Sequence, residues 1–142
     1  MLSNNHLVEL SDSIGTISLL EDLSISDNEL TRLPDTFPQL KSVYELDISF
    51  NKLNALPYGF ETMTNLVSLD LDHNNLTSLP EGLEDWDQVT YFSMKNNPIS
   101  PNDLPSHLSQ LNGTRKRVLS SIVWFIFLAF SLIPVLFALF GF

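Results

Sequence analysis

The sequence predicts an α/β solenoid, built on a parallel sheet and followed by a single transmembrane helix. Two observations carry this prediction: a repeat of 23 residues runs through positions 1–111, and an uncharged apolar stretch occupies positions 118–142. The 142 residues leave room for one ordinary domain. No cysteine is present, which excludes disulfide frameworks, thiolate zinc sites and cysteine nucleophiles.

A column of asparagines defines the repeat. The members recur at intervals of 23 residues: Asn5, Asn28, Asn51, Asn74 and Asn97. Several apolar columns keep the same interval, and a Leu-Pro pair recurs at 33–34, 56–57 and 79–80. A coil of this length cannot close a core alone and has to stack on its neighbours. We therefore expect about five stacked coils over residues 1–111, the first of them partial.

Each coil should contain one short strand just before its asparagine. In residues 23–25, 46–48 and 69–71 two apolar residues flank a polar one, which is the period of a strand with one buried face. After the strand the chain turns away, and an asparagine amide can satisfy the backbone groups left unpaired there. The proline that follows fixes φ and starts the return path.

This pattern resembles the leucine-rich repeat family in the form L-x-x-L-x-L-x-x-N-x-L-x-x-L-P. One copy reads LLEDLSISDNELTRLPDTFPQL, and the resemblance covers about residues 1–111. It implies parallel strands on a concave face, irregular or short helical segments on the convex face, and protein recognition as the default role. The 23-residue, LP-containing variety looks like that of intracellular adaptor-type repeat proteins. The resemblance supplies no catalytic residues.

Both ends of the repeat depart from the pattern. After Asn97 the Leu-Pro pair comes two residues late, at 104–105, so we expect a fifth coil that is complete but modified. The chain starts inside a coil, with apolar repeat columns and no polar cap ahead of them, although solenoids usually need one. We expect either that upstream sequence is missing, which is the interpretation we favour, or that something covers this edge.

The C-terminal segment, residues 118–142, carries no charge and contains six phenylalanines. As a helix it would be about 37 Å long, against a bilayer hydrocarbon core of about 30 Å. A buried core helix is the alternative, but such a helix is ordinarily shorter and bounded by polar turns. Pro134 would kink a membrane helix rather than end it. We predict one transmembrane helix over residues 118–142.

A short basic linker, residues 112–117, precedes the predicted span. It contains Arg115, Lys116 and Arg117, and no charged residue follows it. The positive-inside rule then predicts a single-pass membrane protein with its repeats in the cytosol. The first ten residues do not resemble an export signal, which agrees with this orientation. The alternative is a fragment of a receptor-like protein with extracellular, ligand-binding repeats.

The strand residues that point away from the core should form an acidic concave face. We predict nine partner-binding residues there: Asp22, Asp27, Glu45, Asp47, Phe50, Asp70, Asp72, His73 and Tyr91. Adjacent strands lie about 4.8 Å apart, so Asp47 and Asp70 would stack as like charges that repel by about 0.8 kcal/mol even in water. We interpret this face as a docking site for a basic protein segment. The alternative is that these positions are polar only for solubility.

Composition and motifs argue against other classes of function. A net charge of −10 is too acidic to suggest nucleic-acid binding. A metal site from Asp47, Asp70 and Asp72 lacks any calcium-loop spacing, and neither a hydrolytic triad nor a glycine-rich phosphate loop is recognisable. We predict no cofactor, no metal, no small-molecule substrate and no catalytic residue. The expected function is that of a non-enzymatic, membrane-anchored scaffold or adaptor for another protein.

Overall fold

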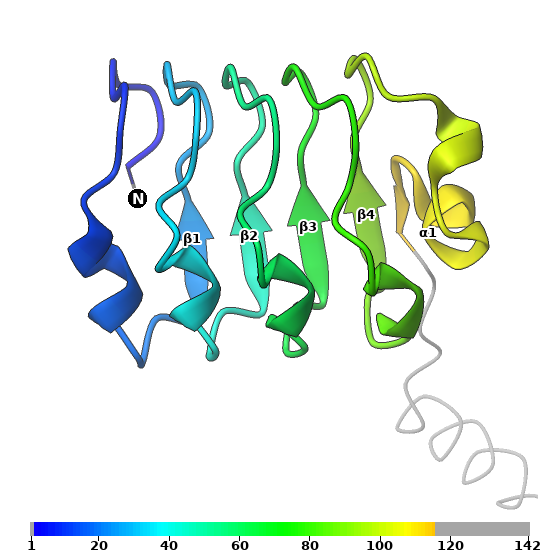
Figure 1. Ribbon diagram of the computed structural model, residues 1–142, viewed down its shortest axis with the longest axis horizontal. Coiled ribbons are helices and arrows are strands. Elements are labelled where there is room, and N and C mark those ends of the chain that lie inside the picture. The colour runs from blue at the N-terminus through cyan, green and yellow to red at the C-terminus, as the bar shows by residue number, and fades with distance from the viewer. Residues whose placement is uncertain (1, 116–142) are drawn as a thin grey trace, which may run out of the picture.

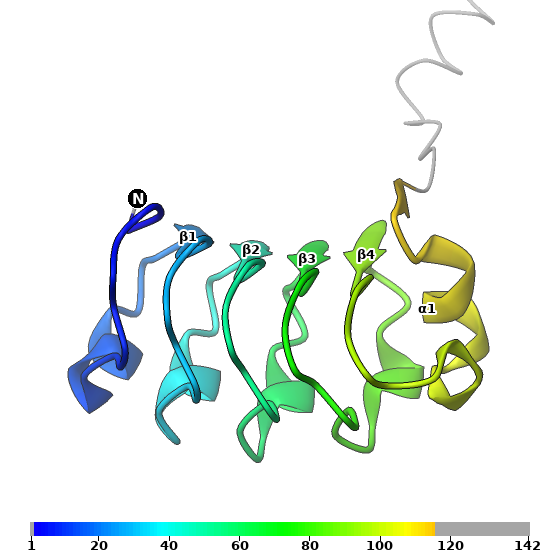
Figure 2. The same ribbon diagram turned by 90° about the horizontal axis from the view of Figure 1, so that it is seen from above.

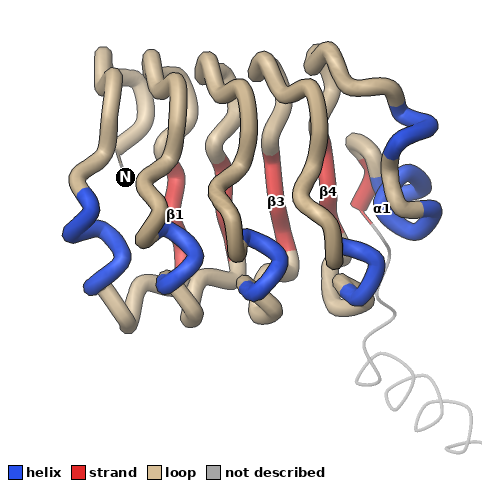
Figure 3. The backbone as a smooth tube through the Cα atoms, viewed as in Figure 1, coloured by secondary structure: helices blue, strands red, loops and turns tan. Residues whose placement is uncertain are grey.

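The computed structural model describes residues 2–115, which form a row of coils stacked side by side (Figure 1). Each coil after the first contributes one short strand to a common sheet and then returns through loops and a short helix, whereas the first coil, over its described residues, has a short helix and no strand (Figure 3). The parallel strands are β1 (Asp22–Ser24), β2 (Glu45–Asp47), β3 (Ser68–Asp70) and β4 (Tyr91–Ser93). The predicted solenoid with a parallel sheet is thereby confirmed.

The register of the sheet follows the 23-residue repeat. Leu23 lies beside Leu46, Leu46 beside Leu69, and Leu69 beside Phe92. These side chains are buried, whereas the residues on either side of them are exposed or partly buried, except Ser93, which is fully buried. Because β1–β4 all keep this register, equivalent positions of the repeat form straight columns across these strands.

Short helices line the side of the solenoid opposite the strands (Figure 2). Four of them are 3-10 helices in equivalent places, η1 (Asp12–Thr16), η2 (Phe37–Gln39), η3 (Phe60–Thr62) and η4 (Leu83–Asp85). The residues that open η2, η3 and η4 are buried against the core. Phe37 and Phe60 stack with ring centroids 6.4 Å apart, and Phe60 contacts Trp86 at 5.9 Å. An aromatic row therefore joins three coils behind the sheet.

The asparagine column ties the coils together, as the sequence predicts. Asn51 Oδ1 accepts a hydrogen bond from Leu30 N–H of the preceding coil at 3.0 Å. Its Nδ2 donates to the carbonyls of Ile25 in the preceding coil and of Ile48 in its own. Asn28, Asn74 and Asn97 repeat this arrangement with the equivalent residues. Each carboxamide thus satisfies backbone groups of two coils at once.

The C-terminal end of the described region is covered. After η5 (Pro101–Asp103), helix α1 (Ser106–Leu111) buries Leu108 and Leu111 against the last coil. The chain then turns back, and β5 (Thr114–Arg115) pairs with β4 in antiparallel direction. The two-residue insertion before α1 gives the fifth coil a different path from the others.

The N-terminal edge is open within the described residues. Ile17 is 47% exposed, although Leu40, Met63 and Trp86, its equivalents in the following coils, are fully buried. A shallow hollow of about 270 Å³ lies here, lined mainly by Leu2, Ile14, Ile17, Leu20 and Leu23. The first coil therefore shows to the outside the apolar surface that every other coil packs against a neighbour.

The predicted transmembrane helix, residues 118–142, and the basic residues Lys116 and Arg117 lie outside the described part of the chain. Among residues 2–115, no helix is both long and apolar enough to cross a membrane.

Candidate functional site

Strand alternation brings most of the predicted binding residues to one surface, which we call the sheet face. It consists of the outward-pointing residues of β1–β4 and of the two or three residues that follow each strand. The structure divides the nine predicted residues between two parts of this surface. Six lie on or directly after the strands, Asp22, Glu45, Asp47, Asp70, Asp72 and Tyr91. The other three lie at the corner where each coil leaves the sheet: Asp27, Phe50 and His73.

The central acids are half-buried and hydrogen-bonded within the sheet face. Asp47 Oδ1 accepts hydrogen bonds from Ser49, from its N–H at 3.0 Å and from its hydroxyl at 2.6 Å. The hydroxyl of Ser24 on β1 also donates to Asp47 Oδ2 at 3.3 Å. A carboxylate that accepts from the backbone two residues ahead forms an Asx-turn. Asp47 therefore shapes the end of its strand in addition to carrying charge.

Asp70 and Asp72 continue this network. Asp70 accepts from Asp72 N–H at 3.0 Å and from the Tyr91 hydroxyl at 3.1 Å. Asp72 in turn accepts from the Ser93 hydroxyl at 2.5 Å and from Lys95 N–H at 2.6 Å. The predicted adjacency of Asp47 and Asp70 is confirmed, since the two residues are register partners on β2 and β3. Both carboxylates are only partly exposed, because neighbouring hydroxyls and amides cover part of each.

Burial and neighbouring charges change the acidity of two groups on this face. Burial raises the pKa of Asp70 above its ordinary value of 3.8, and the nearby carboxylates of Asp72 and Asp47 add to the rise. The hydrogen bonds from Asp72 N–H and the Tyr91 hydroxyl oppose it. Burial also raises the pKa of Tyr91, and the charge of Asp70 acts in the same direction. Tyr91 therefore stays a neutral hydrogen-bond donor to Asp70 at neutral pH.

The corner where the coils leave the sheet, which we call the rim, has a distinct backbone conformation. Asp27, Phe50, His73 and Asn96 all have positive φ, between 52° and 58°. Left-handed backbone costs an L-residue about 1–2 kcal/mol, and asparagine and aspartate tolerate it best. Phenylalanine and histidine are therefore unusual occupants of this position.

The rim side chains form a row across neighbouring coils. The rings of Phe50 and His73 stack, with centroids 4.2 Å apart and planes 13° from parallel. Asn96 Nδ2 lies 2.9 Å from His73 Nε2, in position to donate a hydrogen bond to it. The Phe50 side chain is nevertheless 52% exposed. The rim thus presents an aromatic surface along one edge of the acidic sheet face.

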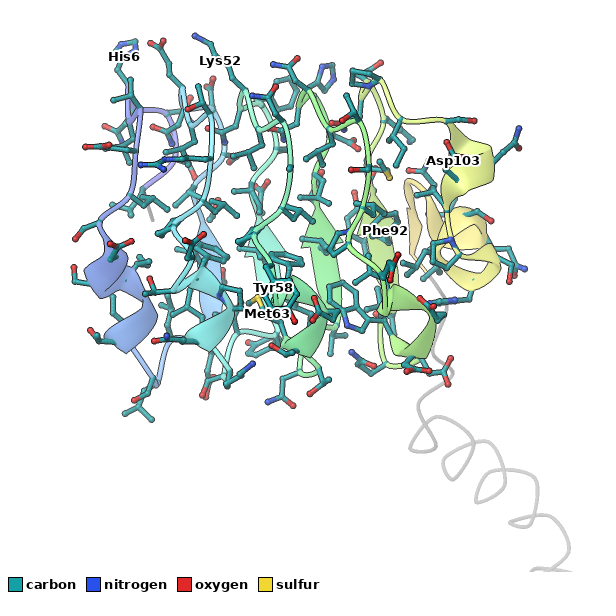
Figure 4. The ribbon with its side chains drawn as sticks, in the orientation of Figure 1. His6, Lys52, Tyr58, Met63, Phe92 and Asp103 are labelled. Carbon is teal, nitrogen blue, oxygen red and sulfur yellow. The ribbon has the colours of Figure 1, made fainter. Side chains whose placement is uncertain are left out.

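An ion-pair network runs beside the rim. Lys52 Nζ lies 2.8 Å from Glu29 Oε2, and His6 Nδ1 lies 3.2 Å from Glu29 Oε1. The hydrogen bond from Lys52 and, to a smaller extent, the one from His6 hold the pKa of Glu29 below its usual range. Figure 4 labels His6 and Lys52 along the same edge of the solenoid. Lys52 therefore already forms an ion pair within its own chain.

Sequence reasoning missed these supporting groups. Ser24 lies 23 residues before Asp47, and this spacing is the signal that could have placed their side chains next to one another. The Ser93 hydroxyl bonds to Asp72, 21 residues before it, so the 23-residue column gives no signal for that bond. The charge alternation between Glu29 and Lys52, also 23 residues apart, could have revealed the ion pair. Asp22 and Glu45 are exposed and register partners, as the sequence predicts for one column.

The predicted membrane-flanking residues are only partly described. Arg115 ends β5 next to Tyr91, and Lys116 and Arg117 lie beyond the described region. Within residues 2–115, no group of three or more histidine, aspartate or glutamate side chains could hold a metal ion.

The repeat pattern and the fold have counterparts in known proteins. The sequence matches the family described as leucine rich repeat over residues 1–53 and 41–99. It is also similar to the solved structure of a leucine-rich repeat protein of Leptospira interrogans, with 32% identity and a TM-score of 0.69. That match covers 79% of this chain, which spans 28% of the length of the Leptospira protein. No curated protein matches the sequence.

Proposed function

Because this chain belongs to the leucine-rich repeat family, we propose that it is a non-enzymatic, membrane-anchored scaffold that binds a basic segment of another protein on its sheet face. Leucine-rich repeat domains typically bind proteins, and a row of coils offers a long, rigid surface for this purpose. The membrane anchor is the uncharged C-terminal segment, and the basic residues before it orient the repeats toward the cytosol.

The charge of the sheet face is the observation that carries the proposal. On β1–β4 and the turns that follow them, the acids outnumber the cations, since Lys52 and Lys95 oppose the six carboxylates of Asp22, Asp27, Glu45, Asp47, Asp70 and Asp72. Lys52 already pairs with Glu29, a seventh acid beside the rim. A surface of one sign raises the rate at which an oppositely charged partner finds it, and this effect weakens as salt is added.

The sheet-face proposal can be tested with a labelled peptide of nine lysines as a model basic segment. The test variant of the full chain, in detergent micelles, carries Asp22→Asn and Glu45→Gln. These two acids are exposed and do not take part in the hydrogen-bond network of Asp47, Asp70 and Asp72. The matched control carries Glu81→Gln with Glu84→Gln, two exposed acids beside η4. We expect the sheet-face pair to weaken binding and to flatten its salt dependence more than the control pair. Equal effects of both pairs would overturn the docking proposal.

The anchor and its orientation can be tested by synthesis into sealed microsomes. We expect the chain to resist alkaline carbonate extraction, and added protease to degrade the repeats from the cytosolic side. The sequon at Asn75, whose side chain is exposed, supplies an independent readout. Glycosylation that disappears in a Thr77→Ala variant would place the repeats in the lumen and favour the receptor-like alternative. Release by carbonate would overturn the anchor.

A further inference from the structure

The rim contains an aromatic ring with one face covered by a neighbouring ring and the other turned toward the preceding coil. Phe50 stacks on His73 of the following coil with nearly parallel planes, so the two ring faces point along the row of coils. The opposite face of Phe50 is therefore turned toward the preceding coil. The rim residue of that coil, 23 positions earlier, is Asp27.

Backbone hydrogen bonds fix Asp27 beside Phe50. Asp27 N–H donates to the Ser49 carbonyl at 3.0 Å, and Asn28 N–H donates to the Phe50 carbonyl at 3.1 Å. An aspartate side chain is shorter and smaller than a phenylalanine side chain, so it cannot cover the whole face of the ring. The ring is about half exposed, which is consistent with open space at this place.

The carboxylate of Asp27 is available for a ligand. It is exposed, and within residues 2–115 it has no hydrogen-bond or ion-pair partner. The basic side chains of the network beside it, Lys52 and His6, both contact Glu29 instead. Asp27 thus differs from Asp47, Asp70 and Asp72, whose oxygens already accept hydrogen bonds from the sheet face.

The backbone supports a functional role for the ring. Phe50 has a φ of 52°, in a column where aspartate and asparagine occupy three of five places: Asn4, Asp27 and Asn96. A bulky residue in this conformation is strained, and such strain clusters at binding sites. An exposed, strained phenylalanine contributes little to the core, so its ring is free to serve recognition.

We propose that Phe50 and Asp27 together bind one arginine side chain of the partner segment. The guanidinium group stacks on the face of Phe50 opposite His73, and two of its N–H groups donate to the Asp27 carboxylate. Arginine fits this site better than lysine because its planar group stacks on an aromatic face and pairs with a carboxylate through two parallel hydrogen bonds. This inference rests on the proposed docking function and names the side chain that is recognised.

The test compares labelled peptides of nine arginines and nine lysines, which carry equal charge, on the full chain in detergent micelles. We expect the arginine peptide to bind about two- to five-fold more tightly than the lysine peptide. Phe50→Leu should reduce this preference while leaving the lysine peptide unchanged. Asp27→Asn should weaken the arginine peptide more than the lysine peptide. The control is Tyr58→Leu, which removes a 96% exposed aromatic ring near η3 and should leave the preference intact.

The outcomes separate this inference from the proposed function. The lysine peptide could bind in a way that depends on the sheet-face acids while the arginine peptide shows no preference, or a preference that survives Phe50→Leu. That result would overturn the arginine site and leave the docking proposal standing. Binding of neither peptide would overturn both. Should Phe50→Leu fail to fold, Phe50→Asn removes the ring with a residue that tolerates the left-handed backbone. A preference that persists in Phe50→Asn overturns the site equally.

Discussion

At the scale of single residues, the carboxamide of Asn51 is a structural link between coils. It is 7% exposed and makes four hydrogen bonds, with Leu30 N–H and with the carbonyls of Ile25, Ile48 and Ser49. Asn51→Ala leaves the buried Leu30 N–H without a partner, whereas the three carbonyls keep hydrogen bonds from Asn28, Asn74 and Asp27. We therefore expect the free energy of unfolding to fall by about 1–3 kcal/mol. Urea denaturation followed by circular dichroism measures this loss.

The matched control for that experiment is Asn5→Ala at the open edge. Asn5 is exposed and its Nδ2 bonds only to carbonyls of its own coil, Leu2 and Ser3. We expect this change to cost less than about 1 kcal/mol, because water can replace the lost bonds. Equal losses in Asn5→Ala and Asn51→Ala would contradict a role of the column in joining coils.

Asp70 gives the sheet face a pH dependence of defined sign. The pKa of Asp70 is higher in the folded than in the unfolded chain, so the folded state binds the proton more tightly. The stability that this proton contributes is fully present below pH 3.8 and is lost as pH rises through the pKa of Asp70 in the folded state. Asp70→Asn keeps an acceptor for Asp72 N–H and removes the charge. We therefore expect the variant to gain stability relative to the native chain as pH rises from about 4 toward neutrality. Denaturation between pH 3 and pH 7 measures the difference.

A constant stability difference across that pH range, or one that shrinks as pH rises, would contradict the raised pKa of Asp70. Glu81→Gln is the control, since Glu81 is exposed on the helix side of the solenoid. It should show no such trend.

The sequence predicts which residues meet on the sheet face, but not how they bond. The 23-residue interval is sufficient to place Asp47 beside Asp70 and Phe50 beside His73, because parallel register preserves columns. The interval contains no information on side-chain rotation. Whether Asp72 points at solvent or at the Ser93 hydroxyl depends on local packing, and this is why its partial burial was not predictable.

At the scale of elements, glycine conformation determines how two of the short helices begin. Gly59 and Gly82 precede η3 and η4 with φ of 86° and 88°, whereas Thr36, at the equivalent position before η2, has φ of −81°. A Cβ atom on Gly82 would also lie 3.1 Å from Glu61 Cγ. The turns before η3 and η4 therefore require glycine, and the turn before η2 does not.

Gly82→Ala should destabilise the chain by about 1–2 kcal/mol, because alanine is strained in the left-handed region. Thermal unfolding measures the loss as a lower midpoint. Glu81→Ala, at the exposed neighbouring position, is the control and should change the midpoint little. If Gly82→Ala matched that control, the backbone before η4 would have to adopt another conformation without cost, as it does before η2.

Among the elements, the strands and the loops after them were predictable, and the C-terminal cover was not. The repeat columns predict β1–β4 because the apolar-polar alternation and the 23-residue interval agree in all four strands. The insertion before Leu104 breaks the interval, so periodicity no longer fixes the conformation that follows. Helix α1 and the antiparallel β5 form there through tertiary contacts, with Leu108 buried and Gly113 N–H donating to the Phe92 carbonyl.

At the scale of the whole molecule, the two ends of the described solenoid differ in whether other elements cover the last apolar edge. Helix α1 and β5 cover the last coil, whereas within residues 2–115 nothing covers the first. Stability in a stacked array depends on contacts between nearest neighbours, so a coil with one neighbour is held less firmly than a coil with two. The same substitution should therefore have unequal effects along one column.

The column of Ile17 and Leu40 offers a direct comparison, since Ile17 is 47% exposed and Leu40 is fully buried. Leu40→Lys forces an ammonium group into the core and should cost more than about 4 kcal/mol, enough to unfold a marginal domain. Ile17→Lys should cost about 1 kcal/mol or less, because its side chain can reach water from the open edge. Guanidinium denaturation measures both, and sedimentation velocity shows whether Ile17→Lys also reduces self-association through the apolar hollow. If Ile17→Lys destabilises the full chain as strongly as Leu40→Lys, the first coil must be covered in the intact protein.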